Sequence, residues 1–138
     1  MTKRELLSAV PFVGDLDEDA LTTLEGHMRL RKFRRGQPIF TEGDPGDSLF
    51  LIASGRVKLF IDNSDGEQLT ILLCAAGTCF GEMAVLDGQP RSASAEALES
   101  TEAWVVPRNA FLDLMRRTPE VAIAVIVFLC SKLRTDLA

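Results

Sequence analysis

The stretch that organises this chain runs from residue 80 to residue 94 and reads FGEMAVLDGQPRSAS. Gly81 has no Cβ, so the backbone there can approach a ligand closely. Residues 82–86 are typical of one short helical turn, whose first amide groups have no partner within the helix and can face an anion. Gly88 and Pro90 then break the chain. The pattern predicts a short helix held between two turns.

Two kinds of side chain in this stretch carry chemistry. Arg91 presents a planar fork of donors that suits a phosphate, and Ser92 adds a hydroxyl donor beside it. Glu82 offers only acceptors when it is ionised, so next to a phosphate it would suit a sugar hydroxyl. Together these residues describe a pocket for a phosphorylated sugar. The structural alternative is that Arg91 simply forms a salt bridge with Glu82 across a turn.

With Ala95 added, this stretch resembles the phosphate-binding cassette of cyclic-nucleotide-binding domains in the Crp/Fnr (catabolite-activator) family of regulators. In that family F-G-E is followed by a short helix, a spacer and R-[ST/A]-A. The resemblance implies that Glu82 takes the ribose 2′-hydroxyl and that Arg91 pairs with the exocyclic phosphate oxygens. The residues that it implies for phosphate and ribose binding are Gly81, Glu82, Met83, Ala84, Arg91 and Ser92.

The resemblance also implies contacts with the base, through less specific residues. By alignment with the family, an apolar wall for the base would contain Leu59, Ile71 and Leu72. Ordinary core packing is the alternative explanation for each of them. Family members often reach the base with a Thr or Ser near the end of their last helix. Thr135 and Asp136 lie close to that place, and neither matches it cleanly.

Composition describes an ordinary globular chain. Its 138 residues are 46% hydrophobic and 25% charged, which leaves room for one domain with a core. The formal net charge of -5 argues against nucleic-acid binding by this segment, because such binding needs Lys and Arg to neutralise phosphates. A basic run at residues 29–35 is either a nucleic-acid patch or, as we favour, a solvated edge strand whose charges deter pairing.

The cysteines are few and widely spaced, at Cys74, Cys79 and Cys130, and no secretory signal precedes them. We therefore expect reduced core thiols in a cytoplasmic protein.

Residues 1–27 are expected to form an N-terminal helical segment, with Asp17 as the N-cap of its second helix. Residues 28–106 contain glycines at a spacing of about ten, which is the rhythm of short strands and turns in a sandwich or barrel. Residues 34–60 also resemble the β-roll of the same family. The predicted fold class is mainly β with flanking helices: a β-roll or jelly-roll (double-stranded β-helix) followed by C-terminal helices.

Residues 107–138 are expected to hold two helices, with Pro107 in the first turn of one and a dimerisation helix over 119–136 as the other. Residues 121–130 are ten consecutive apolar residues, too few to span a bilayer. One face of this helix can pack on the roll, and the other then needs a partner, for which a second copy is the simple answer. This resembles the family's dimer helix. The alternative is a helix that folds back wholly onto its own domain.

The resemblance implies a sensor rather than an enzyme: the effector-binding half of a Crp/Fnr-type transcriptional regulator, with DNA contacted by a helix-turn-helix domain absent from this chain. Ser92 stands where family members that read cGMP often carry threonine, which favours cAMP over cGMP. One alternative is a stand-alone module that regulates another protein. Another is a haem or redox sensor on the same scaffold, with His27, Cys74 and Cys79 as candidate ligands. A metal-dependent jelly-roll enzyme is disfavoured because the chain has one histidine.

Overall fold

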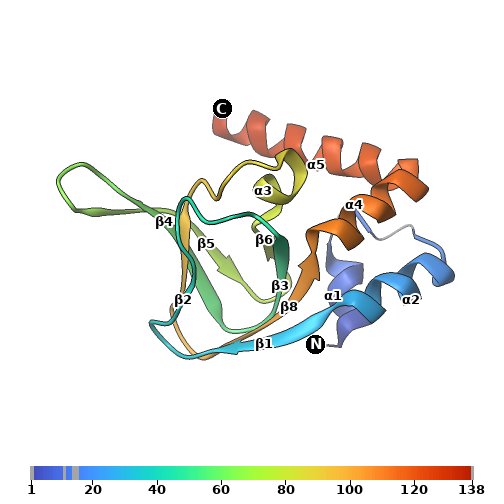
Figure 1. The fold of residues 1–138 in the computed structure, drawn as a ribbon, viewed down its shortest axis with the longest axis horizontal. Coiled ribbons are helices and arrows are strands. Elements are labelled where there is room, and N and C mark those ends of the chain that lie inside the picture. Colours follow the sequence, from blue (N-terminus) through green and yellow to red (C-terminus); the bar gives the residue numbers. More distant parts are fainter. Residues whose placement is uncertain (1, 11, 14–15, 138) are drawn as a thin grey trace.

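The computed structural model describes residues 2–10, 12–13 and 16–137, with side chains as far as residue 134. Helices from both ends of the chain gather at one side of a roll of strands (Figure 1). The elements in chain order are α1 (Lys3–Ala9), α2 (Glu18–His27), β1 (Arg29–Phe33), β2 (Pro38–Phe40), β3 (Ser48–Ser54), β4 (Arg56–Asp62), β5 (Gln68–Ala75), β6 (Cys79–Phe80), α3 (Glu82–Asp87), β7 (Ser94–Ala97), β8 (Thr101–Pro107), α4 (Arg108–Arg117) and α5 (Pro119–Leu137).

Side-chain caps fix the starts of the two N-terminal helices. The Thr2 hydroxyl accepts a hydrogen bond from the Glu5 amide at 3.1 Å, and the Glu5 carboxylate accepts one from the Thr2 amide at 3.4 Å. This reciprocal pair is a capping box. Asp17 accepts from the Ala20 amide at 2.8 Å, which confirms its predicted role as the N-cap of α2.

The strands form two four-stranded antiparallel sheets, ordered β1-β8-β3-β6 and β2-β7-β4-β5. This arrangement, with helices beside it, confirms the predicted mainly-β roll with flanking helices. β1 lies at the edge of its sheet and pairs with β8 from Arg29 opposite Val105 to Phe33 opposite Thr101. Its first four residues are exposed. The basic run therefore includes an edge strand, as predicted, where charge discourages pairing with another chain.

Two hydrophobic clusters lie on opposite faces of β3. Leu49 and Leu51 point into one, whereas Phe50 and Ile52 point into the other, because successive side chains of a strand face opposite ways. The helical cluster comprises Leu6, Leu7, Val10, Phe12, Val13, Leu16, Leu24, Met28, Leu49, Leu51, Val85, Val106, Phe111, Leu114, Val121 and Val125. The roll cluster comprises Phe33, Phe50, Ile52, Val57, Cys74, Phe80, Ala95, Ala97 and Ala103.

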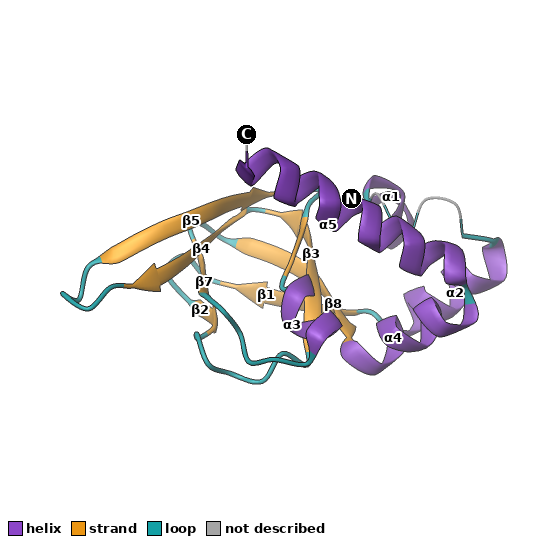
Figure 2. Cartoon of the chain, turned by 90° about the horizontal axis from the view of Figure 1, so that it is seen from above, coloured by secondary structure: helices purple, strands orange, loops and turns teal. Residues whose placement is uncertain are grey.

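The β4–β5 hairpin extends away from the helices (Figure 2). Its tip is set by Asn63, whose side-chain oxygen accepts from the amides of Asp65 at 3.0 Å and Glu67 at 2.9 Å. Leu59 pairs with Leu72, but the next residue of β4 pairs with Thr70, so Ile71 is an extra residue. Such a bulge leaves its residue out of the regular ladder.

The last two helices depart from the sequence predictions in the place of Pro107. Pro107 is the last residue of β8 and the N-cap of α4, one position before the first turn in which it was expected. In α5, Val121 and Val125 are buried, but one face of the helix is exposed. We call that face the exposed stripe; it comprises Ile123, Ile126, Val127, Cys130 and Leu133.

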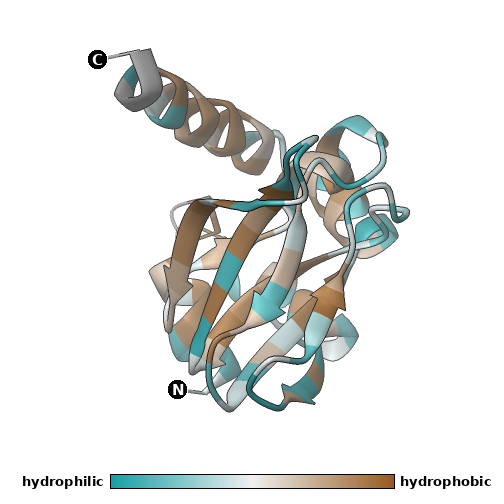
Figure 3. Cartoon of the chain, turned by 90° about the vertical axis from the view of Figure 1, so that its left-hand side faces the viewer, coloured by the Kyte–Doolittle hydropathy of each residue, from teal (hydrophilic) through white to brown (hydrophobic). Residues whose placement is uncertain are grey.

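The exposed stripe has two consequences for the sequence predictions. Because Ile123, Ile126 and Val127 are 59–61% exposed, the alternative in which this helix folds back wholly onto its own domain is wrong. Cys130 is exposed as well, so the prediction that it is a core thiol is also wrong. Figure 3 shows the hydrophobic colour running along α5 where it projects from the roll. Within the described chain, no helix combines the length and apolarity needed to cross a membrane.

Candidate functional site

The cassette predicted at residues 80–94 lies where the roll meets the helices. Phe80 belongs to the roll cluster and stacks on Phe50 with ring centroids 5.0 Å apart, whereas Val85 of α3 belongs to the helical cluster. Between them, Gly81 adopts a left-handed conformation with φ of 84° and is the N-cap of α3. A Cβ at this glycine would lie 2.8 Å from Arg91 Nη1. Both the backbone conformation and the space therefore require glycine.

Arg91 is almost completely buried, with 5% of its surface exposed. Its Nη1 donates to the Gly81 carbonyl at 2.8 Å and its Nη2 to the Ser48 carbonyl at 2.6 Å. The guanidinium carbon lies 4.2 Å from the centroid of the Phe40 ring. Nε has no hydrogen-bond partner among the described residues. A buried donor without a partner is costly, so an acceptor at Nε would stabilise this arrangement.

The charge of Arg91 is only partly balanced by its neighbours. Burial lowers the pKa of the Arg91 guanidinium, and the charges of Asp47, Asp44 and Glu82 oppose that effect. Asp47 is the closest of these, at 4.0 Å from Nη2, but its side chain is 85% exposed and can give little support. An anion that also excludes water would stabilise this cation more than Asp47 does.

Glu82 is the first residue of α3 and is also buried, with 6% of its surface exposed. Its Oε1 accepts a hydrogen bond from Lys132 Nζ of α5 at 2.6 Å. The structural alternative, an ion pair between Arg91 and Glu82 across a turn, is therefore not the arrangement found: the two side chains are held by different partners. Two residues at this site, Ser48 and Lys132, were not among the predicted set.

The other predicted cassette residues occupy different environments. Ala84 is buried against Gly46, where a Cβ would lie 2.1 Å from the Ala84 Cβ, so this loop closes tightly on α3. Ser92 is exposed next to Arg91, and the Met83 side chain is 57% exposed. The structure thus brings Gly81, Glu82, Ala84 and Arg91 around one corner of the roll. The ligand-binding roles of all six remain predictions.

The residues predicted to contact a base lie on three elements, β4, β5 and α5. Leu59 and Leu72 face each other across β4 and β5, and Leu59 is half-buried against the roll cluster. Leu72 and the bulged Ile71 are 43% and 54% exposed. Exposure of these two argues against ordinary core packing as their explanation. The backbones of Thr135 and Asp136 continue α5, but their side chains lie outside the described part of the chain.

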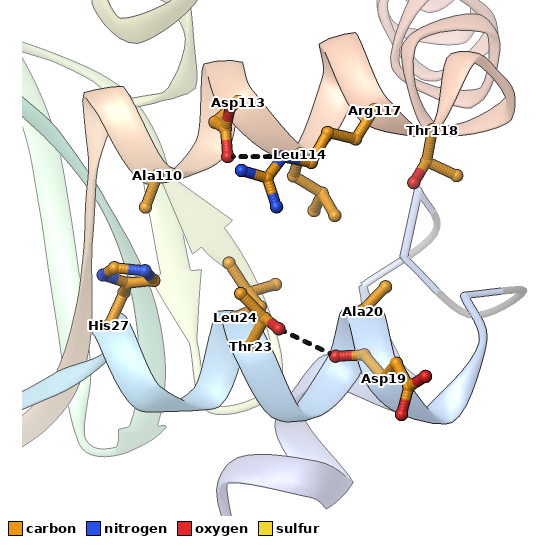
Figure 4. Close-up of a pocket in the computed structure, with 10 residues that line it drawn as sticks. All are labelled: Asp19, Ala20, Thr23, Leu24, His27, Ala110, Asp113, Leu114, Arg117 and Thr118. Carbon is orange, nitrogen blue, oxygen red and sulfur yellow. Dashed lines mark hydrogen bonds and ion pairs between the residues drawn. The ribbon is translucent and has the colours of Figure 1, made fainter.

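Two hollows in the surface lie away from Glu82 and Arg91. One, of about 180 Å³, lies between α2 and α4 and is lined by His27 together with Thr23 and Arg117 (Figure 4). Two of its charged groups pair with each other, since Arg117 Nε lies 3.0 Å from the Asp113 carboxylate. The other, of about 380 Å³, lies on the outer side of the cassette beside Gly46, Gly88 and Arg108.

The candidate ligands of the haem or redox alternative do not form a metal centre. His27 lines the hollow between α2 and α4, whereas Cys74 belongs to the roll cluster. Burial raises the pKa of Cys74 to about 11 and that of Cys79 to about 12, with the charge of Glu82 adding to the effect. In the metal-free chain both are therefore neutral thiols near pH 7. Across the described ranges, no three His, Cys, Asp or Glu side chains are placed to hold a metal.

Comparison with known proteins agrees with this geometry. Residues 30–118 match the family model of the cyclic nucleotide-binding domain. A Thermus thermophilus protein described as a cyclic AMP receptor protein is 43% identical over 108 residues, which are 78% of this chain and 50% of that protein. The chain therefore spans about half the length of this relative.

Solved structures give the same result. The crystal structure of the Thermus thermophilus catabolite activator protein superposes with a TM-score of 0.81 and 39% identity, over 92% of this chain and 60% of that one. The regulatory domain of Toxoplasma gondii PKA, crystallised with cAMP, superposes with a TM-score of 0.76 and 28% identity, over 81% of this chain and 42% of that one. The chain thus belongs to the family of cyclic nucleotide-binding domains, as its resemblance to the Crp/Fnr regulators predicted.

Proposed function

We propose that this chain binds cAMP, with the cyclic phosphate at Arg91 and the ribose at Glu82, and that it is the sensor half of a Crp/Fnr-type transcriptional regulator. In this proposal it is a cytoplasmic binding module and not an enzyme. Contacts with DNA would be made by a part of the regulator outside these 138 residues.

The observation that carries the proposal is the state of Arg91. Its guanidinium is buried and donates to two backbone carbonyls, one of them at the start of α3. Its Nε has no hydrogen-bond partner in the described chain. Arginine that is merely structural normally has its donors satisfied when it is buried. A cyclic phosphate offers acceptor oxygens and a negative charge together, which is what this cation lacks. Met83 and Ala84, at the start of α3, would contribute backbone amides, and Ser92 its hydroxyl.

If the ribose binds at Glu82, the ion pair between Glu82 and Lys132 links the ligand to α5. A ribose 2′-hydroxyl can donate to the Glu82 carboxylate, which accepts from Lys132 in this structure. Lys132 lies on α5, so ligand binding at Glu82 would change the contact that holds α5 to the cassette. One arrangement of α5 has Lys132 bound to Glu82, and in the other this contact is changed. A ligand that binds one of these arrangements more tightly shifts the population toward it.

One implication of the family resemblance and two of the comparisons support cAMP over cGMP. By that resemblance, Ser92 occupies the place where relatives that read cGMP often have threonine. The Thermus thermophilus relative is described as a cyclic AMP receptor protein, and the Toxoplasma gondii regulatory domain was crystallised with cAMP. The base itself would lie against Leu59, Ile71 and Leu72, with Thr135 and Asp136 as its polar neighbours.

We also propose that the exposed stripe of α5 is the dimer interface. Residues 123, 126, 127, 130 and 133 repeat with the spacing of one helix face, and all are exposed. In water such an apolar face is stabilised by burial against another apolar surface. A second copy of α5 presents the same apolar face. Two copies related by a two-fold axis would each bury the exposed stripe of the other.

The test is a thermal-shift and calorimetric titration with cAMP, cGMP and AMP. A ligand that binds only the folded state raises the melting temperature by mass action. We expect a clear rise with cAMP, a smaller one with cGMP and none with AMP. Arg91→Ala should weaken cAMP binding by about 30-fold or more, since it removes a buried charge-assisted contact. Arg116→Ala, an exposed arginine on α4, is the matched control. Unchanged affinity in the Arg91 variant would overturn the proposal.

A further inference from the structure

Arg108 joins the cassette helix to the helices that follow the roll. It is the first residue of α4, and its Nε donates to the Val85 carbonyl of α3 at 2.8 Å. Its backbone amide donates to the Asp47 carbonyl, also at 2.8 Å. One residue therefore binds the loop before β3, the cassette helix and α4. The cyclic-nucleotide contacts proposed above do not use it.

The location of this cation is unfavourable for its own helix. A positive charge in the first turn opposes the dipole of α4, and the first turn of α4 contains no acidic residue to offset it. The guanidinium instead lies at the carboxyl end of α3, where helix carbonyls lack partners within the helix. The Val85 carbonyl is such a group, and Arg108 satisfies it. The side chain is thus placed for α3 and not for α4.

Gly88 leaves the space that this contact needs. It ends α3 in a left-handed conformation with φ of 72°, and its amide donates to the Ala84 carbonyl at 3.0 Å. A Cβ at this position would lie 3.2 Å from Arg108 Nη2. The end of α3 and the Arg108 side chain are therefore fitted to each other.

Residues 46–48 connect Arg108 to the proposed phosphate site. The Ser48 carbonyl accepts from Arg91, the Asp47 carbonyl accepts from the Arg108 amide, and Gly46 packs against Ala84 of α3. Three consecutive residues thus hold both arginines and the helix between them. α3 contacts both β3 and α4, which agrees with these hydrogen bonds.

We infer that Arg108 is a positioning residue that couples the cassette to α4 and α5. It holds α3 so that Glu82, at the start of that helix, faces the ligand, and it transmits displacement of α3 to the first turn of α4. From there the displacement reaches α5, because Phe111 of α4 and Val121 of α5 pack in the helical cluster together with Val85. This inference rests on the proposed binding of a cyclic nucleotide.

The test compares Arg108→Met with Arg108→Lys, using Arg116→Met as the matched control because Arg116 is exposed on the same helix. Affinity for cAMP is measured by calorimetry on the 138-residue chain. Hydrogen exchange followed by mass spectrometry, with and without saturating cAMP, reports residues 80–94 and residues 108–134 separately. Arg108→Met should weaken binding by about three- to tenfold, which lies within the roughly two- to thirtyfold effects of mutations that modulate coupling.

The decisive measurement is which of the two segments changes its rate of hydrogen exchange when cAMP binds. In the unmodified chain and in Arg116→Met we expect changes in both segments. In Arg108→Met the change should persist at residues 80–94 and fall below half at residues 108–134. Arg108→Lys keeps a cation and a donor, so it should give an intermediate response. It also provides the comparison if the Met variant does not fold.

Loss of stability in Arg108→Met with unchanged affinity and an unchanged exchange pattern would mean a merely structural role and would overturn the inference. So would an unmodified chain that binds cAMP without any change at residues 108–134. Absence of cAMP binding by the unmodified chain would overturn the proposed function, and this inference with it. The first two outcomes leave the proposed function standing.

Discussion

Lys132 Nζ lies 2.6 Å from Glu82 Oε1, and this ion pair ties the carboxyl-terminal part of α5 to the first residue of the cassette helix. The partners are unequal: the Glu82 side chain is 7% exposed, whereas that of Lys132 is 42% exposed. The carboxylate therefore depends on the lysine more than the lysine depends on it. Removing one partner of a buried pair leaves a charge without compensation, which costs more than the pair contributes.

Lys132→Met should lower the free energy of unfolding by about 1–3 kcal/mol, because it leaves the Glu82 carboxylate buried without its cation. The double variant Glu82→Gln/Lys132→Met should recover part of that loss, since no buried charge then remains. Urea denaturation of the four proteins of this cycle measures the coupling.

Lys32→Met is the control for the Lys132 variant. Lys32 lies 3.6 Å from Glu102 at the surface, with both side chains more than 40% exposed, so its removal should cost less than about 0.5 kcal/mol. If the two variants lost the same free energy of unfolding, the ion pair between Lys132 and Glu82 would contribute no more than a surface pair.

Gly81→Ala should separate backbone strain from ligand binding when it is compared with Gly66→Ala. Both glycines have positive φ, 84° and 82°, so each alanine should cost about 1–2 kcal/mol of stability. Only at Gly81 would the new Cβ meet a side chain, at 2.8 Å from Arg91 Nη1, whereas Gly66 has open space. We therefore expect cAMP affinity to fall about tenfold in Gly81→Ala and to remain unchanged in Gly66→Ala. Calorimetric titration measures both, and equal affinities would contradict the assigned position of Arg91.

Ile126→Glu should dissociate the proposed dimer, because it places a charge in the middle of the exposed stripe, where the native side chain is 59% exposed. Size-exclusion chromatography with light scattering should report a dimer for the unmodified chain and a monomer for this variant. Leu30→Glu is the matched control, a 40% exposed apolar residue on β1, and should leave the dimer intact. A monomeric unmodified chain would refute the interface.

The thiols should react at very different rates. Near pH 8 one thiol per chain should react rapidly with Ellman's reagent, and Cys130→Ser should abolish that fast phase, because Cys130 is exposed on α5. At that pH the ionised fractions of Cys74 and Cys79, with pKa values of about 11 and about 12, are on the order of one in a thousand or less. A second rapid thiol in the folded protein would contradict this assignment.

The same pKa values predict how stability depends on alkaline pH. The fold favours the neutral thiols, so their contribution is fully present below their ordinary pKa of 9.0 and is lost as pH rises toward 11–12. Urea denaturation at pH 8 and at pH 10.5 should show a lower free energy of unfolding at the higher pH. Cys74→Ala/Cys79→Ala should reduce this difference.

Much of the fold could be predicted from local patterns. The glycine rhythm marks the turns between strands, and Asp17 is a helix cap because its side chain needs only the amide three residues later. The basic run could be placed on an edge strand, since charge is tolerated there. The exposure of Cys130 could not be predicted, because an all-apolar helix gives no periodic signal of which face is covered. Only the packing of Val121 and Val125 against the helical cluster decides that face.

The site residues that lie within one short segment could be predicted from the sequence. Those that come from distant segments could not. Gly81, Glu82 and Arg91 form a recognisable string. Ser48 and Lys132 reach them from 43 and 50 residues away, a separation that no local pattern encodes. One signal was available for Lys132: it lies two residues after the apolar run of residues 121–130, on a partly buried helix, where a nearby anion would stabilise its charge.

Because the side chains of β3 alternate between the helical cluster and the roll cluster, the strand works as a partition between two compartments. Leu49 and Leu51 can be exchanged to suit another set of helices while Phe50 and Ile52 continue to fill the roll. Substitutions in one compartment should therefore leave the packing of the other compartment in place. The residues that join the two compartments are those of the cassette, since Phe80 lies in the roll cluster and Val85 in the helical cluster.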